Sequence, residues 1–177
     1  MFQNWTFGKR LAAGFGLAGF TLLVIVIVSY RNINHLIEVQ GWVSHTHQVR
    51  SELADLLVQL VDAETGARGY VITGADAYLE PYQSALGKIT PTADDVRKLT
   101  VDNPQQQRRI AALAPLIEAR LAHLKQTIEA RRSEGFEAGA KLVRTNAGKI
   151  AMDQIRAVID DADRAAFAVC SAVCATR

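Results

Sequence analysis

The apolar positions of this chain first form one unbroken block and then change to a helical repeat. The block, Leu11 to Tyr30, contains no charged residue. About 20 residues of helix reach roughly 30 Å, the thickness of the hydrocarbon core of a bilayer. The block is apolar on every side rather than along one stripe, which favours a transmembrane helix at 11–30 over a buried core helix.

A cleaved signal peptide is the other alternative for this block. Such a peptide usually has an apolar region of about 7–15 residues and ends at a small-x-small site, whereas this longer block ends in Ser29 and the bulky Tyr30. Lys9 and Arg10 precede the block, no acidic residue occurs in 1–10, and Arg31 follows. The positive-inside tendency therefore places residues 1–10 in the cytoplasm and the rest of the chain outside it.

After residue 31, apolar residues recur at alternating spacings of three and four, as in the helices of a bundle. The first helix is expected to continue directly from the apolar block and to stop near Gly74, with Asp76 as a cap for the next helix. Four series carry this repeat: Trp42, Thr46, Val49, Leu53, Leu56, Leu60, Ala63, Ala67 and Tyr70; Leu79, Tyr82, Leu86, Ile89, Ala93, Val96 and Leu99; Ile110, Leu113, Ile117, Leu121, Leu124 and Ile128; Met152, Ile155, Ile159, Ala162, Ala166, Val169 and Val173.

Prolines and turn residues divide the repeat further. Pro91 should kink or divide the second helix, and Pro115 should kink the third. Asp102 or Asn103 can cap the third helix, with Pro104 at its first position.

No window alternates with period two for long enough to predict a strand. We therefore expect an all-α protein, in which the transmembrane helix is followed by an antiparallel four-helix bundle at 31–165. A short helix is expected around Phe136–Arg144, between two corners. Residues 166–177 form a short apolar tail of about 12 residues, too few to span a membrane.

Composition excludes some classes of protein. The net charge is +2 and no dense basic block occurs, which argues against nucleic acid as a partner. Cys170 and Cys174 are too few and too close for a disulfide framework. A bridge within one helical turn would be strained, so the open alternatives are a bond between two chains and unpaired thiols.

The stretch "DAETGARGY", residues 62–70, is the densest cluster of candidate chemistry. On a helix Asp62 and Glu64 point in different directions, whereas Glu64 and Arg68 are four apart and form an ordinary ion pair. No nucleophile and base accompany them. His45 and His47 also diverge, unlike the i,i+4 histidine pairs that bind metals on helices. We therefore expect no enzyme activity, no metal and no cofactor.

"VDAETGARGYVITGADAYLEPY" resembles the signature of the third class of CHASE domains, extracellular sensor modules of bacterial receptors. The resemblance continues through "LTVDNPQQQRRIAAL", "PLIEARLAHLKQTIEARRSEGFEAG" and "GKIAMDQIRAVID", and covers roughly Ile33 to Asp163. The combination of these motifs is specific, although each piece alone would be weak. The matching residues are Asp62, Glu64, Thr65, Gly66, Arg68, Gly69, Tyr70, Thr73, Gly74, Tyr78, Leu79, Pro81, Tyr82, Asn103, Gly148 and Met152.

The resemblance implies a helical sensor that feeds a cytoplasmic histidine kinase, nucleotide cyclase or chemotaxis output. It does not identify the ligand. Within the motif, Gly66 and Gly69 are expected to let neighbouring segments approach closely, and Tyr70 to pack under the turn. A ligand contact at Arg68, Tyr78 or Tyr82 is a further hypothesis.

We therefore expect a membrane-anchored extracytoplasmic input module that works as a homodimer and transmits a stimulus by rearrangement of its helices. A family member should re-enter the membrane and carry an output domain, and this sequence has neither. It represents either a shortened receptor gene or a single-pass protein that works through a partner. The alternative function is a membrane-tethered helical scaffold without a ligand.

Overall fold

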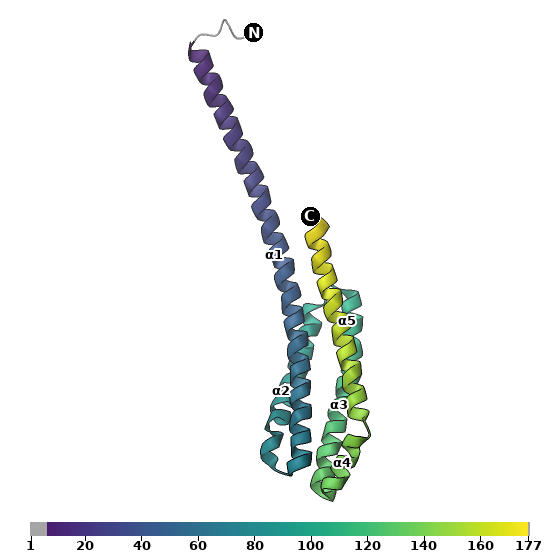
Figure 1. The fold of residues 1–177 in the computed structure, drawn as a ribbon. Helices are drawn as coiled ribbons and strands as arrows, with labels where there is room; N and C mark the ends of the chain where they lie inside the picture. Colours follow the sequence, from purple (N-terminus) through teal and green to yellow (C-terminus); the bar gives the residue numbers. More distant parts are fainter. Residues whose placement is uncertain (1–6, 177) are drawn as a thin grey trace. The chain divides into compact units, whose positions relative to one another are not determined.

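The structure, a computed structural model, describes residues 7–176 as a succession of helices (Figure 1). These are α1 (Phe7–Thr73), the 3-10 helix η1 (Asp76–Leu79), α2 (Glu80–Leu99), α3 (Pro104–Glu134), α4 (Phe136–Arg144) and α5 (Ala147–Thr176). No strand occurs among the described residues, and the predicted all-α class is confirmed. The chain divides into two compact units, Met1–Val43 and Ser44–Arg177.

The described part of the first unit is the N-terminal portion of α1. Within it, Gly14–Asn34 is long and apolar enough to cross a membrane, with a mean hydropathy of 1.8 and none of its side chains buried. This segment overlaps the predicted span at 11–30. Since α1 runs without a break to Thr73, the predicted continuity between the apolar block and the first bundle helix is confirmed.

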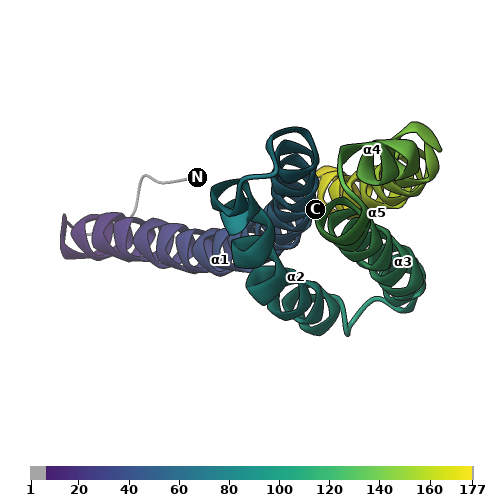
Figure 2. The ribbon, with the colours of Figure 1, turned by 90° about the horizontal axis from the view of Figure 1, so that it is seen from below.

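The second unit is an antiparallel bundle built from α1, α2, α3 and α5, with the short α4 packed on α3 (Figures 1 and 2). α2 turns back beside α1, and α5 runs antiparallel to α3. The core consists of the apolar repeats that these helices turn inward. Its largest fully buried side chains are Leu53, Leu56, Leu60, Ile89, Leu113, Met152, Ile155 and Val96.

The turn after α1 depends on one glycine. Gly74 has a φ of +73°, a left-handed conformation that glycine adopts without steric penalty, and α1 ends at Thr73 as predicted. Asp76, however, is not a cap. The residue before η1 is Ala75, which has no side chain able to cap, and Asp76 accepts a hydrogen bond from Arg132 at 3.1 Å instead.

α3 begins with the predicted cap. The side-chain oxygen of Asn103 accepts hydrogen bonds from the amides of Gln105 and Gln106, both at 3.1 Å, and Pro104 occupies the first helical turn. Deeper in the bundle, Gln106 donates to the backbone carbonyl of Ala162 at 2.8 Å and so joins α3 to α5. The corners on either side of α4 are also as expected, with positive φ at Gly135 and Asn146.

Neither proline divides its helix, so the division considered at Pro91 is wrong. α2 and α3 continue through Pro91 and Pro115. Both prolines are exposed, so water can hydrogen-bond the carbonyl groups that lose a partner. The buried faces of the same helices hold the neighbouring turns in place.

Among the side chains that the structure describes, two members of the apolar repeats are exposed. Leu86 is 39% exposed, and Ala85 takes the buried position beside Ile89 because the packed face of α2 is shifted by one residue there. Trp42, the first member of the first series, is also exposed. Val169 and Val173 lie outside the residues whose side chains the structure describes.

Candidate functional site

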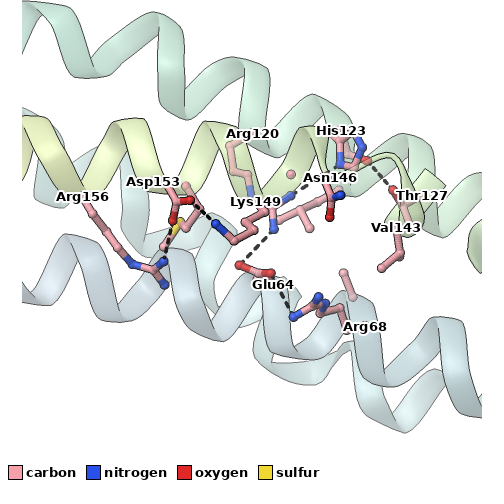
Figure 3. Close-up of a pocket in the computed structure, with 14 residues that line it drawn as sticks. Glu64, Arg68, Arg120, His123, Thr127, Val143, Asn146, Lys149, Asp153 and Arg156 are labelled. Atoms are coloured by element: carbon pink, nitrogen blue, oxygen red, sulfur yellow. Dashed lines mark hydrogen bonds and ion pairs between the residues drawn. The ribbon is translucent and has the colours of Figure 1, made fainter.

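A cavity of about 330 Å³ lies in the bundle between α1, α3 and α5, and it gathers charged side chains from all three helices (Figure 3). Its lining residues are Glu64, Ala67, Arg68, Arg120, His123, Leu124, Thr127, Val143, Asn146, Gly148, Lys149, Met152, Asp153 and Arg156.

Arg120 of α3 is the most deeply buried charged group in this cavity, with a side chain only 3% exposed. One terminal nitrogen lies 3.1 Å from a carboxylate oxygen of Glu64, and the other lies 3.5 Å from Nδ1 of His123. The third nitrogen, Nε, is buried and has no hydrogen-bond partner in the structure. Burial lowers the pKa of Arg120, and Glu64 opposes that shift. Arginine nevertheless stays protonated in proteins, so the cavity holds a buried positive charge.

Glu64 of α1 lies between two arginines (Figure 3). Its second carboxylate oxygen lies 3.3 Å from Arg68, one helical turn further along α1. The ion pair predicted between these two residues is therefore present. Because each carboxylate oxygen already faces a different guanidinium, Glu64 has little capacity left to neutralise further charge.

His123 presents a second unpaired donor. Arginine can only donate hydrogen bonds, so Nδ1 of His123 must accept from Arg120, and the ring proton then sits on Nε2. Nε2 is buried without a partner. Burial, followed by the charge of Arg120, lowers the pKa of His123, which keeps the ring neutral at pH 7.

The first turns of α5 complete the wall. Asp153 accepts from Lys149 at 2.5 Å and from Arg156 at 3.3 Å. The hydrogen bond from Lys149 is the main cause that lowers the pKa of Asp153. Gly148 lies against Arg120: a Cβ at this position would be 2.5 Å from the guanidinium nitrogen Nη1. Gly148 therefore allows α5 to approach the buried arginine.

The structure separates the predicted motif residues into groups. Glu64 and Arg68 line the cavity. Tyr82 lines a different hollow, of about 610 Å³, between α2 and α3. Arg68 and Tyr82 therefore do not share a cavity, and Tyr78 lines neither of these two. Asp62 and Thr65 are exposed on α1.

Most of the remaining motif residues build the turn between α1 and α2. A Cβ on Gly66 would lie 2.8 Å from the backbone nitrogen of Tyr82, and one on Gly69 would lie 2.8 Å from the ring of Tyr78. These close approaches are as predicted. The other members are the buried Tyr70 and Leu79, the half-buried Pro81, and Thr73, whose hydroxyl accepts from the amide of Ala75 at 3.2 Å.

Neither of the two central residues of the cavity, Arg120 and His123, was predicted from the sequence. The helical repeat nevertheless contains a signal for Arg120. Arg120 follows Ile117 by three residues and precedes Leu124 by four, so it occupies a position of the helical repeat that is normally apolar. A charged residue at such a position marks a polar site inside a bundle. His123 carries no comparable signal.

Within the described part of the chain, no three His, Cys, Asp or Glu side chains lie close enough to hold a metal ion. Cys170 is a free, half-buried thiol. The side chain of Cys174 lies outside the described residues, so both alternatives for these cysteines stay open.

Comparisons with known proteins agree with this architecture. The structure is similar to the crystal structure of the sensor domain of histidine kinase HK9 from Rhodopseudomonas palustris, with a TM-score of 0.65 and 23% sequence identity. The similarity covers 70% of this chain and 96% of that domain and shows a shared fold. No curated protein sequence matches the chain. The CHASE3 domain model matches residues 39–168, well over half of the chain. The chain therefore belongs to the CHASE3 domain family.

Proposed function

We propose that this chain is the membrane-anchored, extracytoplasmic input module of a bacterial signal-transduction receptor, and that it transmits a stimulus by rearrangement of its helices without catalysing a reaction. Residues 1–10 lie in the cytoplasm, the apolar segment spans the inner membrane, and 31–165 form the sensor bundle outside. Its output is a cytoplasmic kinase, cyclase or chemotaxis protein. Residues 166–177 are a short tail.

One observation carries the proposal. α1 contains both the apolar segment Gly14–Asn34 and the first helix of the bundle, without an intervening loop. A sliding or rotation of α1 inside the bundle would therefore be passed directly to the membrane segment.

The contact between α1 and α5 supports a mechanical role for these two helices. Arg50 of α1 donates to both carboxylate oxygens of Asp163 of α5, at 2.6 and 3.3 Å, and its guanidinium lies 5.7 Å from the ring centre of Phe167. A stimulus that displaces α5 would thus act on α1. In a homodimer, two such helix pairs would change their packing together.

Disulfide crosslinking in native membranes tests the proposal. Cys170 and Cys174 are first replaced by serine, and single cysteines are then placed from Thr21 to Ser29. We expect crosslinked dimers with a helical period along this segment, as two paired transmembrane helices require. A chain that stays monomeric at every position contradicts the proposal.

Orientation needs a separate measurement. Asn4→Cys should be protected from a membrane-impermeant maleimide in intact cells, whereas Ser44→Cys should be labelled. The reverse pattern contradicts the orientation.

The scaffold alternative predicts a bundle that no small molecule stabilises. A ligand that raises the melting temperature of the chain in proportion to its occupancy would exclude this alternative.

A further inference from the structure

We propose that the cavity lined by Arg120 and His123 is a binding site for a small organic carboxylate, held at the junction of α1, α3 and α5. This assignment names the ligand class of the input module, and its signalling consequence rests on the proposed function. The binding itself does not depend on signalling.

Two unpaired donors define the site. Nε–H of Arg120 and Nε2–H of His123 are both buried and have no partner in the structure. Buried donors without a partner are rare in folded proteins and call for a bound acceptor. A carboxylate has two oxygens, each able to accept from one of these donors.

The charge around the cavity also selects an anion. Arg68, Arg120, Lys149 and Arg156 face two carboxylates, Glu64 and Asp153. Each of these carboxylates is already paired with two of the cations. The cavity therefore keeps an excess of two positive charges.

The start of α5 adds to this excess. Gly148 and Lys149 line the cavity from the first turn of a 30-residue helix. The amides of a first helical turn and the positive end of the helix dipole both favour negative charge.

The apolar part of the wall favours an organic acid over an inorganic anion. Ala67, Leu124, Val143 and Met152 line the cavity beside the cationic groups. A volume of about 330 Å³ lies at the lower end of the range of small-molecule sites. A short aliphatic or aromatic acid would place its carboxylate on Arg120 and His123 and its hydrocarbon portion against this apolar wall.

The full chain, purified in detergent, allows binding to be measured by isothermal titration calorimetry. The probes are acetate, propionate, succinate and benzoate, with inorganic phosphate at matched ionic strength as the competing anion. We expect at least one organic acid to bind and to be preferred over phosphate.

Three variants locate the site. Arg120→Gln removes the central charge, His123→Leu removes the second donor, and Gly148→Ala places a methyl group against the guanidinium of Arg120. Each should weaken binding by about tenfold or more. Arg108→Gln, which removes an exposed cation of α3 outside the cavity, is the matched control and should bind like the parent chain. If Arg120→Gln fails to fold, the affinities of His123→Leu and Gly148→Ala decide whether the cavity is the binding site.

Absence of binding by all four acids overturns the proposal, as does an affinity that His123→Leu and Gly148→Ala both leave unchanged. Tighter binding of phosphate than of any acid overturns the assignment to organic carboxylates. Binding that follows the variants but leaves the Thr21–Ser29 crosslinks unaltered supports the site and contradicts the proposed signalling function instead.

Discussion

The guanidinium of Arg120 lies 3.1 Å from the carboxylate of Glu64, and this ion pair joins α3 to α1 inside the bundle. Removing one partner of a buried pair leaves an uncompensated charge in a poorly solvated place. Glu64→Gln should therefore lower the free energy of unfolding by about 3 kcal/mol, measured by urea denaturation followed by circular dichroism. Asp62→Asn, an exposed carboxylate two residues away, is the control and should change stability little. Equal effects of the two variants would contradict a buried pair.

A comparison of substitutions at Gly66 and Gly87 gives a direct test of close packing between α1 and α2. A methyl group at Gly66 would lie 2.8 Å from a backbone nitrogen of α2, so that helix must move. Gly66→Ala should destabilise the bundle by about 1–3 kcal/mol. A Cβ at Gly87, within α2, meets nothing within 4 Å. Gly87→Ala should therefore stabilise by about 0.5–1 kcal/mol, and the two melting temperatures should move in opposite directions. A shift in the same direction would contradict the contact.

His123 should make the bundle sensitive to acid. Because burial and the charge of Arg120 lower its pKa in the folded state, the unfolded chain takes up this proton first as the pH falls. Stability should therefore be complete above about pH 6.5 and should decrease below it, down to the pKa of the folded state. The other charged groups lining the same cavity are Glu64 and Arg68 from α1 and Lys149, Asp153 and Arg156 from α5.

The measurement is the midpoint of urea unfolding between pH 7.5 and 5. His123→Gln should flatten the slope, whereas His47→Gln, exposed on α1, should retain it. A slope that His123→Gln leaves unchanged would assign the acid sensitivity to other groups.

The link between Arg50 and Asp163 should be measurable as a coupling energy. Both side chains are about one-third exposed, so a double-mutant cycle to alanine should give no more than about 1 kcal/mol. The control cycle combines Arg50 with Asp161, which pairs instead with Arg109 of α3. That cycle should give a coupling close to zero, and two equal couplings would contradict a specific bridge.

Much of the fold follows from the sequence, because helices in a bundle bury apolar residues at regular intervals. The ends of α1 and α3 were predictable for a local reason: glycine and asparagine act on the backbone next to them, as Gly74 and Asn103 do here. The role of Asp76 was not predictable, because its partner Arg132 is distant in sequence. The continuation of α2 through Pro91 was not predictable for a similar reason. Packing of the buried face of α2 against other helices outweighs the loss of one hydrogen bond on the solvent side.

The cavity was less predictable than the fold. The motif that resembles the family contains Glu64 and Arg68, but the residues that give the cavity its character, Arg120 and His123, come from another helix. Gly148 matched the family, yet its contact with Arg120 emerges only when α3 and α5 are placed together. Chemistry that depends on pairs distant in sequence is not encoded in local periodicity.

The close contacts of Gly66 with α2 and of Gly69 with η1 have a consequence for motion within the bundle. A packed interface without room for a methyl group resists gradual sliding, so we expect this end of α1 to move together with η1 and the start of α2. α5 is separated from α1 by a cavity at its first turns and joined to it by charged groups further along. In the proposed signalling movement, the hairpin of α1 and α2 would therefore shift as one piece relative to α5.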